Sequence, residues 1–233
     1  MTPESIDWDT VRLVVFDVDG TLYDQRAMRL RMLSEIVGDV ARTRSLATLR
    51  VLRTYRKLRE RLGDAEIDGF DNVLVAQTAM ANKIDPDKVR TIVAEWMERR
   101  PLAHIRACRY PNIAELFSAL KLKRKSIGIF SDYPARDKLS AMELGADYVV
   151  AASDANVGIL KPHPRGLQLL MTTAGVTPDE TILVGDRIER DGEAARRVGV
   201  RALIRSDRPL DGWLRFSKFS DALFAPLFER SPG

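Results

Sequence analysis

An apolar run near the start of the chain, followed at once by two aspartates, places the strongest constraint on the fold. Residues 11–16 read VRLVVF, and the next polar positions are Asp17, Asp19, Gly20 and Thr21. A mostly β-branched apolar run of this kind predicts a strand that is buried on both faces. Carboxylates at the end of a buried strand are unfavourable unless a metal, a cationic partner or a proton neutralises them. Ligands also bind at the carboxyl ends of strands in open α/β sheets, so this stretch predicts a functional site.

From residue 110 onward the pattern alternates between helix and strand. We expect helices over 111–122, 134–144, 164–174 and 192–198, and strands over 126–131, 147–150, 181–184 and 200–204. Strands separated by helices of this length imply right-handed βαβ units and a parallel sheet, which the strand near residue 13 must join. The predicted fold class is therefore α/β, with a Rossmann-like parallel sheet flanked by helices.

Between the first strand and residue 105 the pattern is helical throughout. One apolar stripe repeats at helical spacing over residues 45–62, a second helix is expected over 70–82, and a third begins after Asp85 and is ended by Pro101. These features predict an all-helical domain, residues 24–105, inserted into a core domain made of residues 1–23 and 106–233.

The end of the chain is rich in aromatic and apolar residues at roughly helical spacing, namely Trp213, Phe216, Phe219, Leu223 and Leu227. This spacing predicts a terminal helix over residues 210–228 that packs on the sheet. The alternative is a surface for a partner or for a homodimer.

Composition narrows the cellular setting. The net charge of +4 and the pI near 9.3 favour anionic partners without requiring nucleic acid. Cys108 is the single cysteine, so an intramolecular disulfide framework is excluded and a reducing compartment fits best. The first ten residues do not resemble a signal peptide, and no apolar run approaches the roughly 18 residues of a membrane-spanning helix. We expect a cytoplasmic protein.

A second group of acids follows the strand at 181–184, in the segment from Gly185 and Asp186 to Asp191. Together with the first pair it would form an oxygen-only site suited to Mg²⁺. Asp191 alone could instead cap the helix at 192–198. For the first pair, a calcium-binding EF-hand loop is excluded. Such a loop needs glycine at its sixth position and glutamate at its twelfth, and this sequence has neither residue at those positions. A glycosyltransferase Asp-x-Asp motif is the weaker alternative.

Two further residues beside predicted strands could take part in binding or catalysis. Lys161 and its following proline precede the helix at 164–174, where a cation and a helix N-terminus together suit a phosphate group. Ser131 ends the strand at 126–131. Each alone has an ordinary explanation, as a loop element or a cap. The sequence contains no Gly-x-Ser-x-Gly elbow, P-loop or Gly-x-Gly-x-x-Gly motif, which excludes the corresponding enzyme classes, and two histidines make a zinc site unexpected.

Taken in order, the motifs resemble those of the haloacid dehalogenase (HAD) superfamily, in the phosphatase branch with a helical cap inserted after the first motif. The resemblance rests on Asp17-Val18-Asp19-Gly20-Thr21, Ser131, Lys161-Pro162 and the segment from Gly185-Asp186 to Asp191, and it covers residues 10–205. It implies a Mg²⁺-dependent phosphatase that hydrolyses a small phosphorylated metabolite through an aspartyl-phosphate intermediate.

The resemblance also implies a role for each matched residue. Asp17 would be the nucleophile and Asp19 the general acid and base. The metal would be held by the Asp17 side chain, the Asp19 backbone carbonyl and Asp186, with Asp191 orienting these ligands.

Thr21, Ser131 and Lys161 would bind the oxygens of the transferred phosphoryl group. The second aspartate, Asp19, favours phosphoryl transfer over dehalogenation, because dehalogenases of the superfamily lack it. A phosphomutase or a phosphonatase on the same scaffold is the enzymatic alternative. The alternative outside the enzymes is a catalytically inactive HAD domain that only binds a partner.

Two features concern the substrate side. Asp132 stands where the superfamily often has asparagine, and we interpret it as the N-cap of the helix at 134–144, with Arg136 or Lys138 able to neutralise its charge. The alternative is a contact with a hydroxyl or amine of the substrate. In the inserted helices, Arg53 and Lys57 belong to a basic face with Arg50 and Arg61, and Arg56 and Arg59 lie alongside it. A solvated face is the simple interpretation, and binding of a second anionic group of the substrate is the alternative.

Overall fold

The structure is a computed structural model of the chain that describes residues 6–229. Within these residues, six parallel strands form one sheet in the order β3-β2-β1-β4-β5-β6. Their bounds are β1 Leu13–Phe16, β2 Ser126–Ser131, β3 Tyr148–Ala151, β4 Thr181–Gly185, β5 Arg201–Arg205 and β6 Leu214–Phe216. The predicted α/β fold with a Rossmann-like parallel sheet is confirmed.

The first strand lies at the centre of the sheet, as its composition predicts. In β1, Val14 and Phe16 pack into one hydrophobic cluster, whereas Leu13 and Val15 pack into the cluster on the opposite face. Leu13 pairs with β2 on one side and with β4 on the other. The carboxyl ends of these three neighbouring parallel strands therefore meet at one edge of the sheet.

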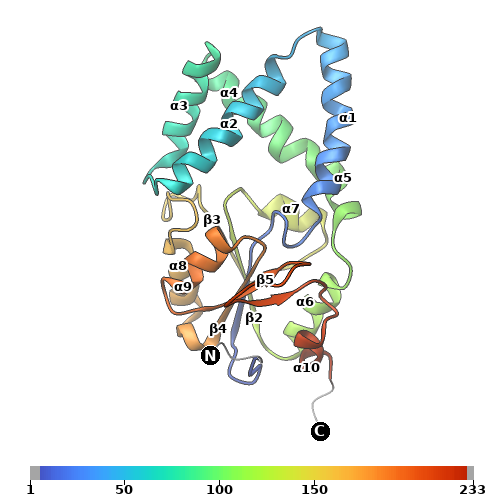
Figure 1. Cartoon of the computed structure of the whole chain (residues 1–233), viewed down its shortest axis with the longest axis vertical. Coiled ribbons are helices and arrows are strands. Elements are labelled where there is room, and N and C mark those ends of the chain that lie inside the picture. Colours follow the sequence, from blue (N-terminus) through green and yellow to red (C-terminus); the bar gives the residue numbers. More distant parts are fainter. Residues whose placement is uncertain (1–5, 230–233) are drawn as a thin grey trace.

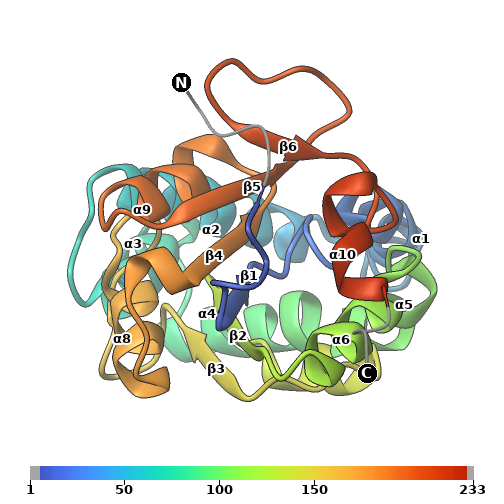
Figure 2. The ribbon, with the colours of Figure 1, turned by 90° about the horizontal axis from the view of Figure 1, so that it is seen from below.

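Helices cover both faces. Figure 2 shows α8 (Arg165–Ala174) and α9 (Glu193–Arg196) on one side of the sheet, and α6 (Ile113–Leu122) and α10 (Ala225–Phe228) on the other. The short helix α7 (Arg136–Ala141) joins the second group, since Leu139 belongs to the same cluster as Val14 and Phe16. The sheet is thus a buried middle layer.

Five helices gather beyond the carboxyl edge of the sheet (Figure 1). They are α1 Gln25–Thr43, α2 Ala47–Asp64, α3 Phe70–Asn82, α4 Pro86–Val93 and α5 Arg100–Cys108; residues 25–108 are called the helical region below. Asp24 caps α1, where its carboxylate accepts hydrogen bonds from two backbone amides, and Asp85 caps α4, where its carboxylate accepts one. In the part of the chain that the structure describes, no helix combines the length and apolar character needed to cross a membrane.

The chain enters and leaves the helical region at adjacent positions. The backbone amide of Asp24 donates to the carbonyl of Cys108 at 2.9 Å, and the amide of Tyr110 donates to the carbonyl of Leu22 at 3.1 Å. The two crossings therefore form a short paired connection between the sheet and the helical region.

Pro101 does not end a helix, contrary to the sequence-based expectation. A π-helical segment (Ala94–Arg99) joins α4 to α5, and Pro101 lies in the first turn of α5. Proline is tolerated in the first turn of a helix, where its fixed φ angle suits the helical backbone. The helical path therefore continues to Cys108.

The expectation of a terminal helix over residues 210–228 is also wrong. This segment adds strand β6 to the edge of the sheet and then forms a 3₁₀ turn (Ala222–Phe224) and the four-residue helix α10. Phe216, Phe219 and Phe224 are buried, and the rings of Phe216 and Phe224 meet edge to face at 5.1 Å. These aromatics pack in the core, and the partner or homodimer surface considered as the alternative stays a prediction. Residues 1–5 and 230–233 lie outside the described residues. They include part of the N-terminal segment expected not to be a signal peptide and the end of the expected core domain.

Candidate active site

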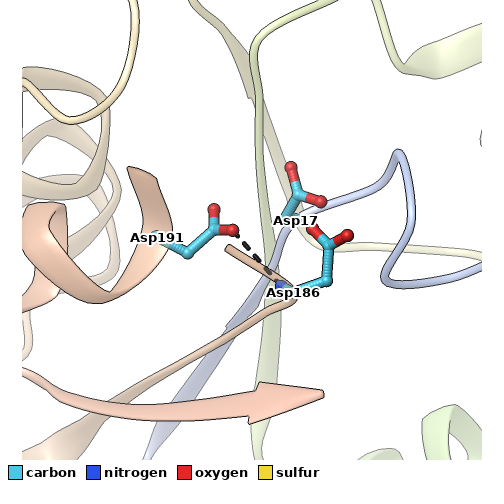
Figure 3. A group of neighbouring side chains, drawn as sticks. All are labelled: Asp17, Asp186 and Asp191. Atoms are coloured by element: carbon cyan, nitrogen blue, oxygen red, sulfur yellow. Dashed lines mark hydrogen bonds between the residues drawn. The ribbon is translucent and has the colours of Figure 1, made fainter. Parts of the chain in front are cut away.

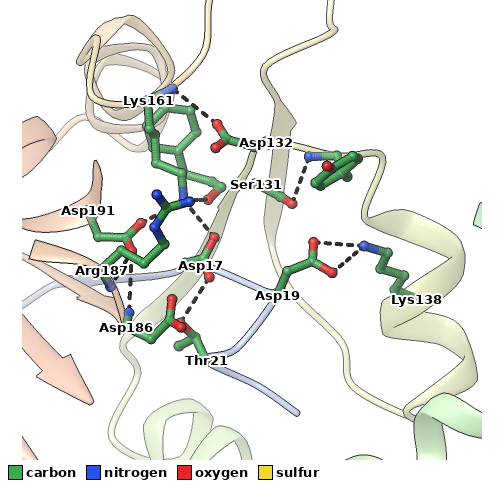
Figure 4. A network of polar contacts seen from close by, with 12 residues as sticks. Asp17, Asp19, Thr21, Ser131, Asp132, Lys138, Lys161, Asp186, Arg187 and Asp191 are labelled. Atoms are coloured by element: carbon green, nitrogen blue, oxygen red, sulfur yellow. Dashed lines mark hydrogen bonds and ion pairs between the residues drawn. The ribbon is translucent and has the colours of Figure 1, made fainter. Parts of the chain in front are cut away.

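Three strand ends and one loop bring most of the sequence-predicted residues together. Asp17 follows β1, Ser131 ends β2 and Asp186 follows β4, while Lys161 reaches in from the loop before α8 (Figure 4). The carboxyl edge of the sheet therefore carries the candidate site, as expected for an open α/β fold.

Asp17 is the centre of this network and is almost fully buried. Its Oδ1 accepts a hydrogen bond from Lys161 Nζ at 2.6 Å, and its Oδ2 accepts one from Thr21 Oγ1 at 2.9 Å. Burial raises the pKa of Asp17 well above its usual value, Lys161 opposes this shift, and the neighbouring carboxylates of Asp191 and Asp186 add to it. The position thus holds more negative charge than one lysine neutralises.

Lys161 is a buried cation between two carboxylates. Its ammonium lies 2.6 Å from Asp17 Oδ1 and 2.6 Å from Asp191 Oδ1, and it also donates to the carbonyl of Phe130 at 3.2 Å. Burial alone lowers the pKa of Lys161, but Asp17 and Asp191 outweigh it and hold that pKa above its usual value. Lys161 is therefore a permanent positive charge beside Asp17.

Asp17, Asp186 and Asp191 form an oxygen-only cluster (Figure 3). One carboxylate oxygen from each lies within 4.8 Å of the others. Burial raises the pKa of Asp186 to about 7, and the charge of Asp191 contributes to this shift. Such a cluster has the hard donor set that Mg²⁺ prefers, and a divalent cation would relieve its charge repulsion. The residues present therefore fit a magnesium ion.

Gly20 explains how Asp186 comes so close to the turn after β1. A side chain at this position would place its Cβ 2.2 Å from Asp186 Oδ2, and the φ angle of +103° is one that residues with side chains rarely adopt. The glycine of the first motif is thus required by the close approach of the Asp186 carboxylate.

Asp191 does not cap a helix, contrary to the alternative considered for it. It lies within a π-helical segment (Ile188–Gly192) that precedes α9. Its Oδ2 accepts hydrogen bonds from the backbone amides of Asp186 at 3.3 Å and Arg187 at 3.1 Å, and its Oδ1 binds Lys161. Asp191 therefore holds the Asp186 loop and Lys161 in fixed relative positions.

Asp19 points away from this cluster toward a different cation. Lys138 of α7 donates to both carboxylate oxygens, at 2.6 and 2.7 Å (Figure 4). The Tyr23 hydroxyl donates to Oδ1. Burial alone raises the pKa of Asp19, but Lys138 outweighs it, so this pKa lies below its usual value. The two aspartates of the first motif therefore occupy different electrostatic environments.

Lys138 and Tyr23 are functional candidates that the sequence analysis did not single out for this position. Tyr23 lies four residues after Asp19, a spacing that could have marked it. Lys138 lies 119 positions away from Asp19, and only the tertiary fold brings it there.

Asp132 does not cap α7. That helix begins at Arg136, with Ala135 at the N-cap position and no side-chain cap. The carboxylate of Asp132 instead accepts a hydrogen bond from the backbone amide of Lys161 at 3.1 Å, and the buried Ser131 hydroxyl accepts one from the amide of Tyr133 at 3.2 Å. Asp132 therefore connects the end of β2 to the Lys161 loop.

The basic face of α2 reaches the core through a residue other than those expected. Arg53, Lys57 and also Arg136 are exposed and do not join the network. Arg59, on the same helix, is buried; it lies 3.9 Å above the Tyr133 ring and donates to the backbone carbonyl of Asp132. Its Nε is buried without a hydrogen-bond partner among the described residues. Arg59 is thus the residue of this helix that contacts the segment after β2.

The likeness to known proteins agrees with this geometry. The family model of the haloacid dehalogenase-like hydrolases matches residues 11–199. Among curated proteins, phosphoglycolate phosphatase 1 of Pseudomonas aeruginosa is 26% identical over 198 residues, which cover 82% of this chain and 67% of that protein. Pyrophosphatase PpaX of Oceanobacillus iheyensis is 24% identical over 181 residues, 76% of this chain and 75% of that protein.

Two solved structures show the same fold. The HAD-hydrolase YfnB of Bacillus subtilis, bound to magnesium, superposes with a TM-score of 0.70 at 13% identity, covering 94% of this chain and 99% of that one. A 2-haloacid dehalogenase of Pseudomonas syringae pv. tomato gives a TM-score of 0.64 at 18% identity, with coverage of 94% and 98%. The family expected from the motifs is confirmed. Since the family model spans most of the chain, the protein belongs to the haloacid dehalogenase-like hydrolases.

Proposed function

We propose that this hydrolase is a Mg²⁺-dependent phosphatase that acts on a small phosphomonoester through an aspartyl-phosphate on Asp17. The names of the relatives support this reaction class, because they include phosphoglycolate phosphatases, a pyrophosphatase and a phosphoserine phosphatase. The structural likeness to dehalogenases concerns the fold and leaves the reaction open.

The observation that carries the proposal is the separate placement of two carboxylates, Asp17, which is buried, and Asp19, which is half-buried. Asp17 faces Lys161, Thr21 and the acidic cluster, whereas Asp19 is held by Lys138. Phosphomonoester hydrolysis through a covalent intermediate needs one carboxylate as nucleophile and another as proton carrier. A reaction that displaces halide needs no proton on its leaving group, so the second carboxylate favours phosphatase chemistry.

In the first step, a carboxylate oxygen of Asp17 attacks phosphorus and the bond from phosphorus to the leaving oxygen breaks. Although Lys138 lowers the pKa of Asp19, this step uses the form of Asp19 that carries a proton. Asp19 gives that proton to the leaving oxygen, so the product leaves as an alcohol. Lys161, Thr21 and Ser131 stabilise the negative charge on the phosphoryl oxygens. A magnesium ion held by Asp17, Asp186 and the Asp19 backbone carbonyl, with Asp191 orienting the group, would neutralise further charge.

In the second step, Asp19 accepts a proton from a water molecule, whose oxygen attacks phosphorus and breaks the bond to Asp17. Inorganic phosphate is released, and Asp19 is protonated again for the next cycle. Tyr23 and Lys138 keep the Asp19 carboxylate in place through both steps.

We also propose that residues 24–105 form a cap domain over a core of residues 1–23 and 106–233, and that the cap limits the substrate to a small metabolite. The YfnB structure is described as revealing interdomain movement, which supports closure as a property of such a cap. Arg59, with its unpartnered Nε, is the cap residue best placed to meet an anionic group of the substrate.

A screen of phosphorylated metabolites with the purified protein and MgCl₂ tests the proposal. We expect release of inorganic phosphate from one or more small phosphomonoesters and loss of this activity in Asp17→Asn. Absence of turnover across a broad panel that includes carboxylate-bearing phosphomonoesters would contradict the proposed function.

Magnesium is expected to stabilise the protein more at pH 8 than at pH 6. The pKa of Asp186 is raised to about 7, so below that pH the metal must displace a proton.

The same raised pKa of Asp186 means that the free energy of unfolding of the metal-free protein falls as pH rises from about 4, the pKa of this group in the unfolded chain, toward 7. Thermal unfolding with MgCl₂ or EDTA measures both effects; saturation at a hundredfold excess over Kd adds about 2.7 kcal/mol. If magnesium stabilised Asp186→Asn as much as wild type, Asp186 would not be a metal ligand.

Lys138→Met is expected to lower kcat about 10- to 100-fold, because Asp19 then loses the group that positions it. The loss should be larger for alkyl phosphates than for p-nitrophenyl phosphate, whose good leaving group needs little protonation. Steady-state kinetics with both substrates make the comparison, and the exposed lysine of α4 supplies the control, Lys88→Met. An equal loss on both substrates would show that Lys138 does not act through Asp19.

A further inference from the structure

Arg190 joins the helical region to the loop that carries Lys161. Its guanidinium donates to the backbone carbonyl of Lys161 at 2.8 Å. On the other side it donates to the backbone carbonyl of Glu60 at 3.0 Å, to the Glu60 carboxylate at 3.1 Å and to the carboxylate of Asp64 at 2.6 Å. One buried side chain therefore binds both the C-terminal turn of α2 and the backbone of the proposed phosphate-binding lysine.

Gly63 makes this contact sterically feasible. It lies within α2, where glycine is less favourable than alanine. A Cβ at this position would lie 2.5 Å from Nη1 of Arg190 and 3.0 Å from its Cζ. The helix thus has its weakest helix-forming residue at the place where the guanidinium crosses it.

Arg190 differs from Arg187 and Arg197, two arginines close to it in the sequence that also pair with the helical region. Arg187 pairs with Glu60, and Arg197 pairs with Glu66 at 2.7 Å, but 38% and 31% of these arginine side chains are exposed, compared with 5% for Arg190. Exposed pairs contribute little to stability, and neither of these two side chains has a hydrogen bond to Lys161 among the described contacts.

We propose that Arg190 is a positioning residue that couples docking of the helical region to the placement of Lys161; this rests on the proposed function of Lys161 as a phosphate ligand. When α2 is docked, Arg190 is fixed by Glu60 and Asp64 and holds the Lys161 carbonyl. When α2 moves away, Arg190 loses three of its four acceptors, and the lysine loop loses a rigid support. Phosphoryl transfer is thereby confined to the docked state, in which the helical region excludes water.

The test compares Arg190→Met with Gly63→Ala and with the control Arg197→Met, which removes an ion pair across the same boundary. With p-nitrophenyl phosphate and MgCl₂, we expect kcat to fall at least about tenfold in the first two variants with a smaller change in KM, since misplacement of a charge-stabilising group acts on the transition state. Inhibition by orthovanadate should weaken in parallel. Arg197→Met should stay within about threefold of wild type. Gly63→Ala is expected to fold, because alanine favours a helix more than glycine does, so this variant tests the proposal even where Arg190→Met fails to fold.

Hydrogen exchange of the backbone amides over residues 159–163 provides a readout that needs no turnover. Arg190→Met should speed this exchange relative to both wild type and Arg197→Met. The inference is overturned if this exchange is unchanged, if Arg190→Met keeps kcat within threefold of wild type, or if Arg197→Met loses as much activity. A wild-type protein that hydrolyses no phosphomonoester would instead contradict the proposed function, and the exchange experiment would still decide whether Arg190 anchors the loop.

Discussion

Asp17→Asn should abolish phosphate release, with kcat lowered by about four orders of magnitude. The amide has nearly the shape of the carboxylate but cannot attack phosphorus, so no covalent intermediate forms. The fold should persist, because the substitution removes one of three carboxylates that repel one another and leaves Asp191 as a partner for Lys161. Phosphate release from the best substrate of the metabolite screen measures the loss, and thermal unfolding verifies that the protein is folded.

Asp19→Asn is the matched comparison, since it leaves the nucleophile in place. Acid quenching followed by mass spectrometry should find a phosphoryl group on Asp19→Asn, whose intermediate hydrolyses slowly, and none on Asp17→Asn. A residual kcat above a tenth of the wild-type value in Asp17→Asn would show that another group attacks phosphorus.

The largest loss of stability is expected for Lys161→Met. The substitution leaves the carboxylates of Asp17 and Asp191, each 2.6 Å from the ammonium in the native protein, without their shared cation. Removing one partner of a buried ion pair typically costs about 3–5 kcal/mol. Urea unfolding of the metal-free protein at pH 8 measures the change in the free energy of unfolding.

A double-mutant cycle separates charge compensation from packing at this position. If the loss arises from uncompensated charge, Lys161→Met combined with Asp17→Asn should be more stable than the sum of the single effects by at least about 1 kcal/mol. Additive effects, or a loss below about 1 kcal/mol in Lys161→Met alone, would mean that the carboxylates take up protons or solvent at little cost.

The sheet and the strand-end residues were predictable because both depend on local sequence. The apolar run of β1 indicates burial, and parallel strands bring Asp17, Ser131 and Asp186 to one edge whatever the details of packing. The pairing of Asp19 with Lys138 could not be predicted in this way, because it depends on how α7 packs after a loop of uncertain length. Local sequence also favoured an N-cap role for Asp132, but the Lys161 amide competes for its carboxylate.

The rotation of α2 posed the same difficulty. Arg53, Lys57 and Arg59 all lie on one basic helix, and periodicity alone does not decide which of them faces the sheet. The choice of Arg59 follows from stacking on Tyr133, a contact between residues 74 positions apart in the sequence whose geometry only the fold determines. Strand β6 was missed because three residues are too few for a periodic signal, and the surrounding aromatics also fit a helix.

The paired connection at Asp24 and Cys108 has an evolutionary consequence. Because the chain leaves and rejoins the sheet at hydrogen-bonded neighbours, the ends of the whole segment between them meet, and the strands on either side need not adjust to its length. If the segment acts as the proposed cap, changes in it that keep the contacts of Glu60 and Asp64 with Arg190 would alter which molecules are admitted while the reaction machinery stays intact. Selection on substrate choice and selection on chemistry can therefore act on separate stretches of one gene.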